Sequence, residues 1–322
     1  MLGGAGYIGS VVSQGLCRSG YEVVVFDSLS TGHADALPRD AVFVHADIVD
    51  GQRLEDTFRK HNFDAVMYFA GLIQAGESMR LPGIYFANNI ANVITVLNLM
   101  IKHEVVNFVF SSSAAVYGNP SSVPIDESAL TCPTNPYGES KLMVEQLLKW
   151  YGSQCGLRYA SLRYFNAAGA EENLGEDHQP ETHLIPLALN AAIGSGPPLT
   201  VYGTDYPTPD GTCIRDYIHV LDLADAHVLA LEQVVSGETL TCNLGNGKGF
   251  SVREVVDAVR SVTGMPMPVV EGPRRPGDPA ELVASSDRAK QLLGWQPKLD
   301  DLGDIVETAW RWKRSHPKGY QK

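Results

Sequence analysis

Short apolar runs alternate with helical segments along the first half of this 322-residue chain. The apolar runs are rich in Val and Phe and lie at residues 21–27, 41–47, 64–70, 107–113 and 158–166. Helical patterns lie at about residues 7–19, 51–61, 83–103 and 136–154. Apolar runs that do not alternate with polar residues are typical of strands buried on both faces of a parallel sheet. The order therefore predicts an α/β fold built on a doubly wound parallel sheet.

The second half of the chain has a different composition. Residues 166–211 are rich in Pro, Gly, Asn and acidic side chains, and a Pro- and Arg-rich loop lies at residues 271–281. We expect a first domain over residues 1–165, with return segments around 213–245. A smaller, interleaved mixed α/β domain is expected over residues 166–322.

The charge and cysteine content excludes several classes of partner. The chain has 25 basic and 37 acidic residues, a formal net charge of −12, whereas a nucleic-acid backbone needs a clustered basic face. Its five cysteines form no C-x-x-C pair, which favours reduced thiols and a cytoplasmic location over disulfides or a zinc site. We find no signal-peptide pattern and no apolar run of the ~20 residues that span a bilayer. We therefore expect no nucleic-acid partner, no metal and no membrane partner.

Three glycines at a fixed spacing lie in the first stretch of the chain, MLGGAGYIGS. Gly3, Gly6 and Gly9 match G-x-x-G-x-x-G. In this pattern the first glycine permits a tight turn, the second admits a pyrophosphate, and the third lets a helix pack closely on a sheet. The helix that begins at Tyr7 and Ile8 would direct free N–H groups toward the phosphates. The motif predicts a dinucleotide site, with a plain structural turn as the alternative.

Acidic residues end the next two predicted strands. Asp27 ends the first of them, where a carboxylate accepts hydrogen bonds from an adenosine ribose and repels a 2′-phosphate, which favours NAD over NADP. Asp47 and Ile48 end the second and are placed to meet the adenine. The alternatives are a solvated turn for Asp27 and an ordinary strand end for the other two.

Only Met1 and Leu2 precede the glycine turn, although a whole strand usually leads into it. In this fold that strand lies in the middle of the sheet. We expect the first strand to be missing, so that the strands at 21–27 and 64–70 each lose a partner. The sequence is then expected to be truncated by about four or five residues relative to a functional protein of this fold.

The stretch NPYGESK places Tyr137 and Lys141 four residues apart, on one face of a predicted helix. Ser113 ends the strand NFVFSSS, and ligands of open α/β sheets bind at such strand ends. A phenol has a reference pKa of ~10, which positive charge from Lys141 and an oxidised nicotinamide would lower. Tyr137 would then take a proton from an alcohol, with Ser113 bonded to both hydroxyls, while the carbon gives a hydride to the cofactor. A surface pair on a helix is the alternative for the Tyr/Lys spacing alone.

Together these residues resemble the extended short-chain dehydrogenase/reductase family, which has a Rossmann-type fold, and within it the epimerases that interconvert UDP-glucose and UDP-galactose. The similarity covers essentially the whole chain and includes FAGLIQAGES, FSSSAAVYG, NPYGESKLMVEQ, LRYFNAAGA, DGTCIRDYIHVLDLADAH and RRPGDPAELVAS. The resemblance implies reversible epimerisation at C4 of a UDP-hexose, through a 4-keto intermediate, with transient hydride transfer to tightly bound NAD. It also implies that the first domain binds NAD, that the second binds the nucleotide sugar, and that helices 83–103 and 136–154 join two copies as a homodimer.

The resemblance further implies roles for individual residues. The catalytic residues would be Ser113, Tyr137 and Lys141. NAD would be bound by Gly3, Gly6, Tyr7, Ile8, Gly9, Asp27, Asp47, Ile48, Phe69, Ala70, Gly71, Asn88, Lys141, Tyr164 and Phe165. The UDP-sugar would be bound by Ser113, Tyr137, Asn166, Leu184, Tyr202, Arg215, Arg275 and Asp278. Guanidinium forks match phosphate oxygens, and a surface ion pair is the alternative for each arginine.

Three other functions remain as alternatives. A 4,6-dehydratase of the same family would need an Asp-Glu pair where Ala114 and Ala115 stand, which disfavours it. Another nucleotide-sugar epimerase, for UDP-N-acetylhexosamines or uronates, is harder to exclude. Leu282 stands where some members carry a bulky tyrosine, and its smaller side chain would admit N-acetylated sugars. Ile73 and His183 stand where some members have a lysine and an asparagine. A non-catalytic NAD sensor is disfavoured, because sensors tend to lose the Tyr/Lys pair and this chain keeps both residues. That alternative gains support only if the first strand is missing.

Overall fold

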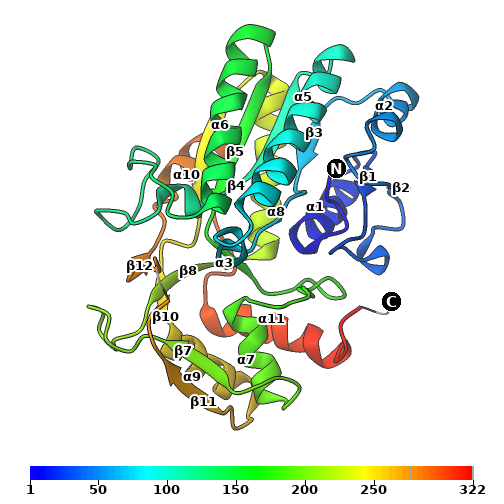
Figure 1. Cartoon of the computed structure of the whole chain (residues 1–322). Coiled ribbons are helices and arrows are strands. Elements are labelled where there is room, and N and C mark those ends of the chain that lie inside the picture. The colour runs from blue at the N-terminus through cyan, green and yellow to red at the C-terminus, as the bar shows by residue number, and fades with distance from the viewer. Residues whose placement is uncertain (276, 321–322) are drawn as a thin grey trace.

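A parallel sheet forms the centre of the larger part of the molecule (Figure 1). The computed structural model describes residues 1–275 and 277–320. The strands of this sheet are β1 (Val24–Asp27), β2 (Val42–His45), β3 (Val66–Tyr68), β4 (Asn107–Ser113), β5 (Arg158–Tyr164) and β9 (Leu240–Leu244). β1 pairs with β2, and the order on the other side is β3-β4-β5-β9, all parallel. The predicted α/β fold with a parallel sheet is confirmed.

Met1 and Leu2 occupy the place of a central strand between β1 and β3. Leu2 forms parallel bridges to Phe26 on one side and to Tyr68 on the other. Its N–H donates to the Met67 carbonyl at 2.9 Å, and its carbonyl accepts from Phe69 N–H at 2.8 Å. The expectation that β1 and β3 lose their partner is therefore wrong, and a missing first strand is not supported. Leu2 pairs with both neighbouring strands, and the glycine turn begins at the next position.

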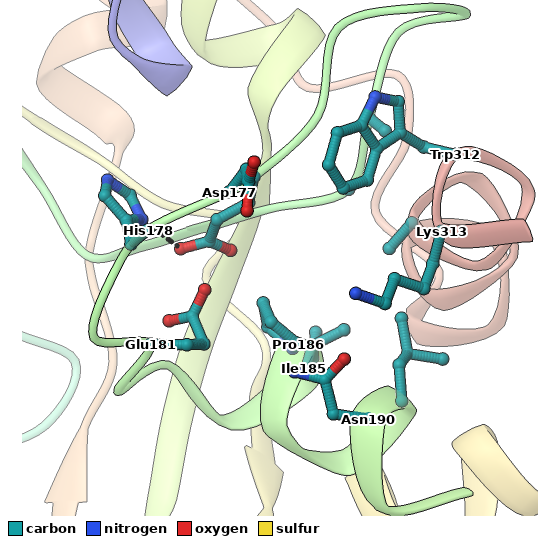
Figure 2. Close-up of a pocket in the computed structure, with 13 residues that line it drawn as sticks. Asp177, His178, Glu181, Ile185, Pro186, Asn190, Trp312 and Lys313 are labelled. Atoms are coloured by element: carbon teal, nitrogen blue, oxygen red, sulfur yellow. Dashed lines mark hydrogen bonds and ion pairs between the residues drawn. The ribbon is translucent and has the colours of Figure 1, made fainter. Parts of the chain in front are cut away.

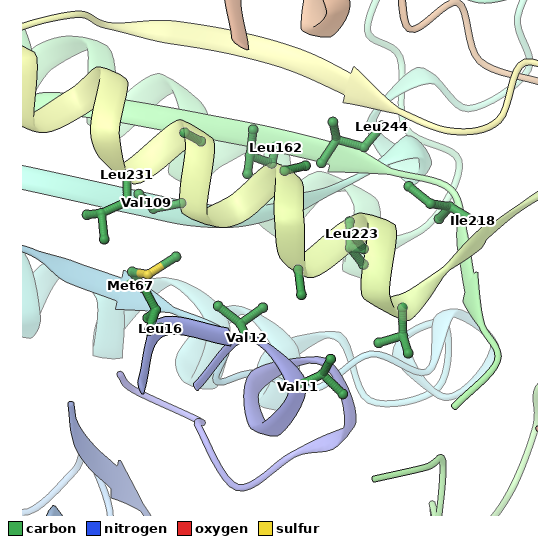
Figure 3. Packing of buried hydrophobic residues seen from close by; sticks show 14 of the residues in the cluster. Val11, Val12, Leu16, Met67, Val109, Leu162, Ile218, Leu223, Leu231 and Leu244 are labelled. Carbon is green, nitrogen blue, oxygen red and sulfur yellow. The ribbon is translucent and has the colours of Figure 1, made fainter. Parts of the chain in front are cut away.

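Helices cover both faces of this sheet, as a doubly wound fold requires. On one face α1 (Tyr7–Arg18) and α8 (Val220–Ser236) pack on Met67, Val109 and Leu162 (Figure 3). On the other face α2 (Gly51–Lys60), α5 (Asn92–Lys102) and α6 (Pro136–Cys155) pack on Tyr68, Phe108 and Phe110. Neighbouring residues of one strand, such as Met67 and Tyr68, thus enter opposite cores, which explains the continuous apolar runs in the sequence.

The rest of the chain forms a smaller unit below the large sheet in Figure 1. Strand β8 (Ile214–His219) pairs with β6 (Asn166–Ala168), β10 (Gly249–Ser251) and β12 (Glu281–Leu282). A second pair joins β7 (Leu199–Tyr202) to β11 (Val269–Gly272). Its helices are α7 (Leu184–Ala192), α9 (Val252–Thr263) and α11 (Leu302–Ser315), which share one apolar core. The chain returns to the large sheet through α8 and β9 and packs α10 (Asp287–Leu293) on them, so the two units are interleaved.

Shorter helical turns complete the chain. They are η1 (Ala34–Ala36), α3 (Ala75–Ser78), α4 (Pro82–Phe86), η2 (Ala87–Ala91) and η3 (Ala114–Tyr117). α4, η2 and α5 run on as one helix over Pro82–Lys102, which has the length and apolar composition to cross a membrane. The sequence expectation that no such run exists is therefore wrong. One helix of this kind is weak evidence for a membrane, since a core helix meets the same criteria, and its inner residues Val93 and Val96 are buried against the sheet.

The Leu2→Ala variant tests the central position of this residue. The Leu2 side chain is 4% exposed and packs with Phe26 and Tyr68, so its truncation leaves a cavity between β1 and β3. We expect a loss of about 2–5 kcal/mol in the free energy of unfolding, measured by urea denaturation. Val49→Ala is the control, because Val49 is 72% exposed and should change stability by less than about 0.5 kcal/mol. Equal stability of the two variants would contradict the central placement of Leu2.

Candidate active site and dinucleotide site

The glycine turn joins Leu2 to α1 and has room for backbone only. Gly3 has a positive φ of +76°, and a Cβ there would lie 2.5 Å from the backbone nitrogen of Ala70. A Cβ on Gly9 would lie 2.3 Å from the Gly3 carbonyl oxygen. α1 begins at Tyr7 after Gly6, which offers its first turn no side-chain cap. Open N–H groups at a helix start beside a glycine turn fit the pyrophosphate of a dinucleotide.

Asp27 lies at the end of β1, directly beside the glycine turn. One of its carboxylate oxygens accepts from Ala5 N–H at 2.9 Å, and the other accepts from Leu29 N–H at 2.8 Å. Each oxygen keeps a second lone pair for a ribose hydroxyl. At the end of β2, Asp47 is exposed and Ile48 is 7% exposed. The structure thus places these three residues at the carboxyl ends of neighbouring strands, as the sequence predicted.

The residues after β3 reach the same edge of the sheet. Phe69, Ala70 and Gly71 follow β3, and Gly71 has a φ of +147°, a conformation that side chains rarely adopt. Asn89, which was not predicted, is 4% exposed and holds this turn by bonds to both the N–H and the carbonyl of Leu72. The predicted Asn88 is half-buried. The Asn-Asn pair is visible in the sequence, but only the direction of the helix decides which of the two faces the strand end.

Ser113, Tyr137 and Lys141 come together at the end of β4. Asn135 caps the start of α6 by accepting from Gly138 N–H at 2.9 Å, which places Tyr137 in the first turn and Lys141 one turn later. Ser113 is the last residue of β4, and its side chain lies close enough to the Tyr137 phenol to lower the pKa of that phenol. The Lys141 Nζ donates to the Ser111 carbonyl at 2.8 Å and lies 5.8 Å from the centre of the Tyr137 ring.

Burial changes the acidity of both groups on α6. It raises the pKa of the Tyr137 phenol, and the nearby Ser113 side chain lowers it. Burial also lowers the pKa of Lys141 to about 8. Desolvation therefore opposes the low phenol pKa that a base requires. A further positive charge beside the ring, such as an oxidised nicotinamide, is what would offset it.

A buried polar network that the sequence did not reveal supports this site. Glu145, one turn after Lys141 on α6, accepts from Arg163 Nε at 2.9 Å and from Ser112 Oγ at 2.6 Å. Arg163 Nη1 also donates to the Tyr117 hydroxyl at 2.8 Å. The network ties α6 to β4 and β5 and so sets the position of the helix that carries Tyr137 and Lys141. Its members are far apart in the sequence, so no spacing marks them.

The predicted nicotinamide-side residues lie at the end of β5. Tyr164 is hydrogen-bonded to the Ser111 hydroxyl, and its ring packs 5.8 Å from that of His227. Phe165 is 9% exposed, and Leu282 of β12 packs against its cluster. The structure thus places Tyr164 and Phe165 at the carboxyl end of β5, and Leu282 lies beside a predicted cofactor contact.

The predicted substrate residues of the smaller unit form two pairs. Arg215 of β8 is ion-paired with Asp278, and the guanidinium of Arg275 lies 4.1 Å from the centre of the Tyr202 ring. Asn166 donates from its amide to the Asp216 carbonyl at 2.9 Å. The remaining position of the smaller unit is Leu184, the first residue of α7. Ile73, which stands in the larger unit where some members of the family have a lysine, is 38% exposed. Basic side chains for a diphosphate are thus present in an otherwise acidic chain.

Comparisons with known proteins agree with this geometry. The model of the family described as NAD dependent epimerase/dehydratase matches residues 1–245. The chain is 51% identical to UDP-glucose 4-epimerase of Halalkalibacterium halodurans, over 99% of this chain and 96% of that protein. A crystal structure of a UDP-glucose 4-epimerase matches with a TM-score of 0.97 and 50% identity, covering 100% of this chain and 98% of that one. The Brucella ovis UDP-glucose 4-epimerase in complex with NAD matches with a TM-score of 0.93 and 48% identity, over 96% of both chains.

The Gly9→Ala variant tests the glycine turn. The added Cβ meets the fixed backbone of Gly3, so the turn must open and the dinucleotide site is lost. We expect the variant to contain less than about a tenth of the NAD that the parent contains, measured as NAD released on denaturation. Gly15→Ala on the same helix is the matched control, because a Cβ there meets nothing within 4 Å. It should keep its NAD and be more stable by up to about 1 kcal/mol. Full NAD content in Gly9→Ala would contradict this role.

Proposed function

The chain belongs to the NAD dependent epimerase/dehydratase family, and on this premise we propose that it interconverts UDP-glucose and UDP-galactose by epimerisation at C4. The observation that carries the proposal is the meeting of Ser113, Tyr137 and Lys141 at the end of β4, in a chain about half identical over its length to UDP-glucose 4-epimerases. The function and the NAD requirement that the sequence resemblance implied are confirmed by these relatives.

We propose that the glycine turn and the strand ends bind NAD. Gly3, Gly6 and Gly9 would accept the pyrophosphate, with Tyr7 and Ile8 at the start of α1. Asp27 would bind the ribose, with Asp47 and Ile48 beside the adenine. Lys141, Tyr164 and Phe165 would lie toward the nicotinamide. The other proposed NAD contacts are Phe69, Ala70, Gly71 and Asn88. When bound, NAD supplies a reversible acceptor for a hydride.

The proposed chemistry of the protein is proton transfer at Tyr137. Its phenolate oxygen takes the proton of the sugar 4-hydroxyl as the C4 hydride leaves, which produces a 4-keto sugar. The phenol later returns the proton when hydride is added to the opposite face of C4, so no net oxidation occurs. Lys141 stabilises the phenolate by its charge, and Ser113 holds the phenol and the sugar hydroxyl in line. Glu145 and Arg163 keep α6 in position and do not touch the sugar in this scheme.

We propose that the smaller unit holds the UDP part of the substrate. Arg215 and Arg275 would bind the diphosphate, because guanidinium forks match its oxygens. The other proposed contacts are Asn166, Leu184, Tyr202 and Asp278. In this division residues 1–165 bind NAD, and residues 166–322, which return to the first domain around 213–245, bind the nucleotide sugar.

A homodimer is the proposed assembly. α5 and α6 lie side by side on one face of the sheet (Figure 1), and several apolar residues around them are exposed. Trp150 is 67% exposed, Ile84 is 54% exposed and Met143 is 38% exposed. A second copy would cover this face. We also propose a cytoplasmic location, which is supported by five free cysteines.

The alternative functions are less well supported. Ala114 and Ala115 form part of η3 behind Ser113 and carry no acidic group for dehydration. The NAD-sensor alternative depended on a missing first strand, which the pairing of Leu2 does not support. A broader sugar range is supported by Leu282, which is half-buried beside the cluster of Phe165.

Tyr137→Phe tests the catalytic assignment. Removal of the phenol oxygen removes the proton acceptor, so we expect kcat with UDP-galactose to fall by about 10²–10⁴-fold while bound NAD is kept. The matched control is Tyr151→Phe on the same helix, where the Tyr151 hydroxyl donates to the exposed Asn98 side chain at 2.7 Å. It should retain parental activity. Conversion of UDP-galactose to UDP-glucose without added cofactor is the measurement, and a Tyr137→Phe variant with parental kcat would refute the assignment.

Leu282→Tyr tests the sugar range. If the small side chain admits an N-acetyl group, the parent turns over UDP-N-acetylglucosamine, and the tyrosine lowers kcat/KM for that sugar by at least about tenfold relative to UDP-galactose. Leu282→Met conserves volume and should keep both activities. No detectable turnover of UDP-N-acetylglucosamine by the parent would sink this assignment.

A further inference from the structure

A fully buried carboxylate lies in the middle of β8 and has no role in the proposed function. Asp216 is 0% exposed. In the part of the chain that the structure describes, no cation is paired with it, and its neighbour Arg215 is paired with Asp278 instead. Burying a charge without a cation is costly. The position therefore calls for a task that a neutral side chain cannot perform.

Three backbone N–H groups from two separate segments donate to this carboxylate. Its Oδ1 accepts from Asn246 at 2.8 Å, and its Oδ2 accepts from Gly247 at 3.0 Å and from Ala284 at 3.1 Å. The fit is close, since a Cβ on Gly245 would lie 2.6 Å from Oδ2. Asp216 therefore joins the turn between β9 and β10 to the residues that follow β12.

The segment from Asp278 to Ala284 carries two positions of the proposed substrate site. Asp278 is ion-paired with Arg215, and Leu282 lies opposite Arg215 in the register of β12 on β8. β12 is only two residues long, so its own ladder holds it weakly. A slip of one residue would turn Leu282 to the other face. The bond from Ala284 N–H to Asp216 fixes the register directly beyond the strand.

Asp216 acts through these neighbours, because successive side chains of a strand point to opposite faces and Arg215 points to the site. We propose that Asp216 is a positioning residue for the UDP-sugar, whose carboxylate holds the segment 278–284 in register beside Arg215. Its main-chain carbonyl also accepts from the amide of Asn166, another proposed substrate contact, at 2.9 Å. This role rests on the proposed function, since it assumes the UDP site described there.

The charged form of Asp216 is the form that fits its neighbours. A carboxylate only accepts hydrogen bonds, whereas an asparagine amide or a protonated acid would direct a hydrogen at N–H donors. Burial raises the pKa of Asp216 to about 6, although the three N–H groups lower it. Above this pH the carboxylate is charged and holds β12 in register. As the pH falls through about 6 it takes up a proton and this hold weakens.

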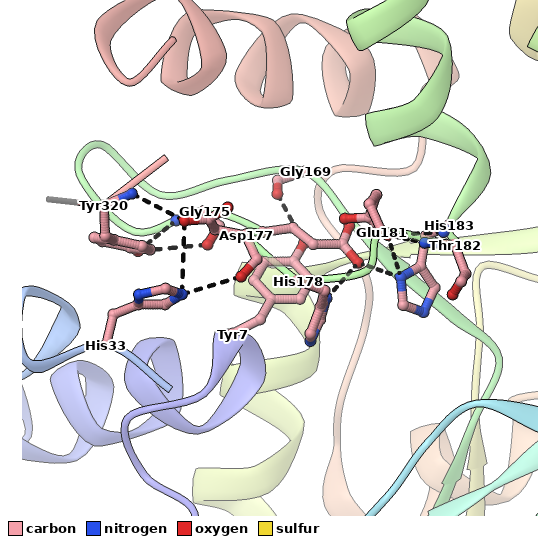
Figure 4. A network of polar contacts seen from close by, with 11 residues as sticks. Tyr7, His33, Gly169, Gly175, Asp177, His178, Glu181, Thr182, His183 and Tyr320 are labelled. Carbon is pink, nitrogen blue, oxygen red and sulfur yellow. Dashed lines mark hydrogen bonds and ion pairs between the residues drawn. The ribbon is translucent and has the colours of Figure 1, made fainter. Parts of the chain in front are cut away.

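Other titratable groups of the smaller unit lie elsewhere and do not mimic this change. At the loop before α7, the pKa of His183 is lowered by burial but raised to about 10 overall by Glu176 and Glu181 (Figure 4). Asp177, His178 and Lys313 line a cavity of about 50 Å³ between that loop, α7 and α11, and Asp216 is not part of its lining (Figure 2). The groups packed on Asp216 are neutral, namely Asn166, Asn246, Gly247 and Ala284.

Asp216→Asn tests the proposal in the full-length protein with its bound NAD. Because a hydrogen bond to a charged group is lost, we expect KM for UDP-galactose and the Kd for UDP to rise about tenfold. We expect kcat to change by less than about threefold, and the NAD content to stay parental. The Kd for UDP, which is not turned over, is measured by calorimetry at about pH 7.5.

The pH dependence of KM gives a second measurement that needs no variant. In the parent, KM for UDP-galactose should rise by at least about threefold from about pH 7.5 to about pH 5, as Asp216 takes up its proton. In Asp216→Asn, KM should be high and equal at both ends of this range. If Asp216→Asn does not fold, the pH dependence of the parent decides the proposal.

Asp222→Asn is the matched control for a merely structural effect. Asp222 of α8 is 2% exposed and also accepts backbone N–H groups, from Lys298 at 2.9 Å and from Leu299 at 2.8 Å. The control should lower Tm but keep the parental KM and its pH dependence.

The outcomes separate this proposal from the proposed function. Parental KM and Kd in a folded Asp216→Asn, or a parental KM that stays constant down to about pH 5, would overturn the positioning role. A parent that binds UDP but does not convert UDP-galactose would overturn the proposed function, and the Kd for UDP would then decide the positioning role by itself.

Discussion

The edge of the sheet at the glycine turn depends on backbone hydrogen bonds to Met1 and Leu2. Leu2 pairs with β1 and β3 at once, so it closes the sheet at its centre and presents Gly3 at the edge where ligands bind. The turn that follows admits no Cβ at Gly3 or Gly9, because the backbone of residue 70 and the turn itself lie too close. The hydrogen bond from Ala5 N–H holds the carboxylate of Asp27 beside this turn, and α1 begins two residues later at Tyr7.

A second constraint positions α6, the helix that carries Tyr137 and Lys141. The Glu145–Arg163 pair is buried between α6 and β5, with side-chain exposures of 3% and 8%. Such a pair is costly to bury and adds little stability, but it specifies one position of the helix, since any shift leaves a charge unpaired. Because Lys141 lies one turn before Glu145, the same contact sets where Lys141 and Tyr137 meet Ser113.

The fold and much of the site could be predicted because they follow from local patterns. Continuous apolar runs indicated strands with two buried faces, and the structure buries Met67 and Tyr68 in opposite cores. The missing-strand prediction was wrong because it counted residues in a strand, whereas the sheet requires only paired N–H and carbonyl groups. Asn89 and the Glu145–Arg163 pair were not predicted, because their partners lie on other elements at no regular spacing.

The sequence by itself determined the alternation of strands and helices, the glycine turn and the Tyr137–Lys141 spacing, since each is a property of neighbouring residues. Tertiary structure alone decided which side chains converge. The histidines and glutamates of the segment GEDHQPETH are visible in the sequence. However, only the path of the loop brings Glu176 Oε1 and His183 Nδ1 within 2.7 Å of each other. Likewise, only the packing of β12 places Leu282 beside the cluster of Phe165. Convergence depends on the direction of the backbone in three dimensions, which residue spacing does not specify.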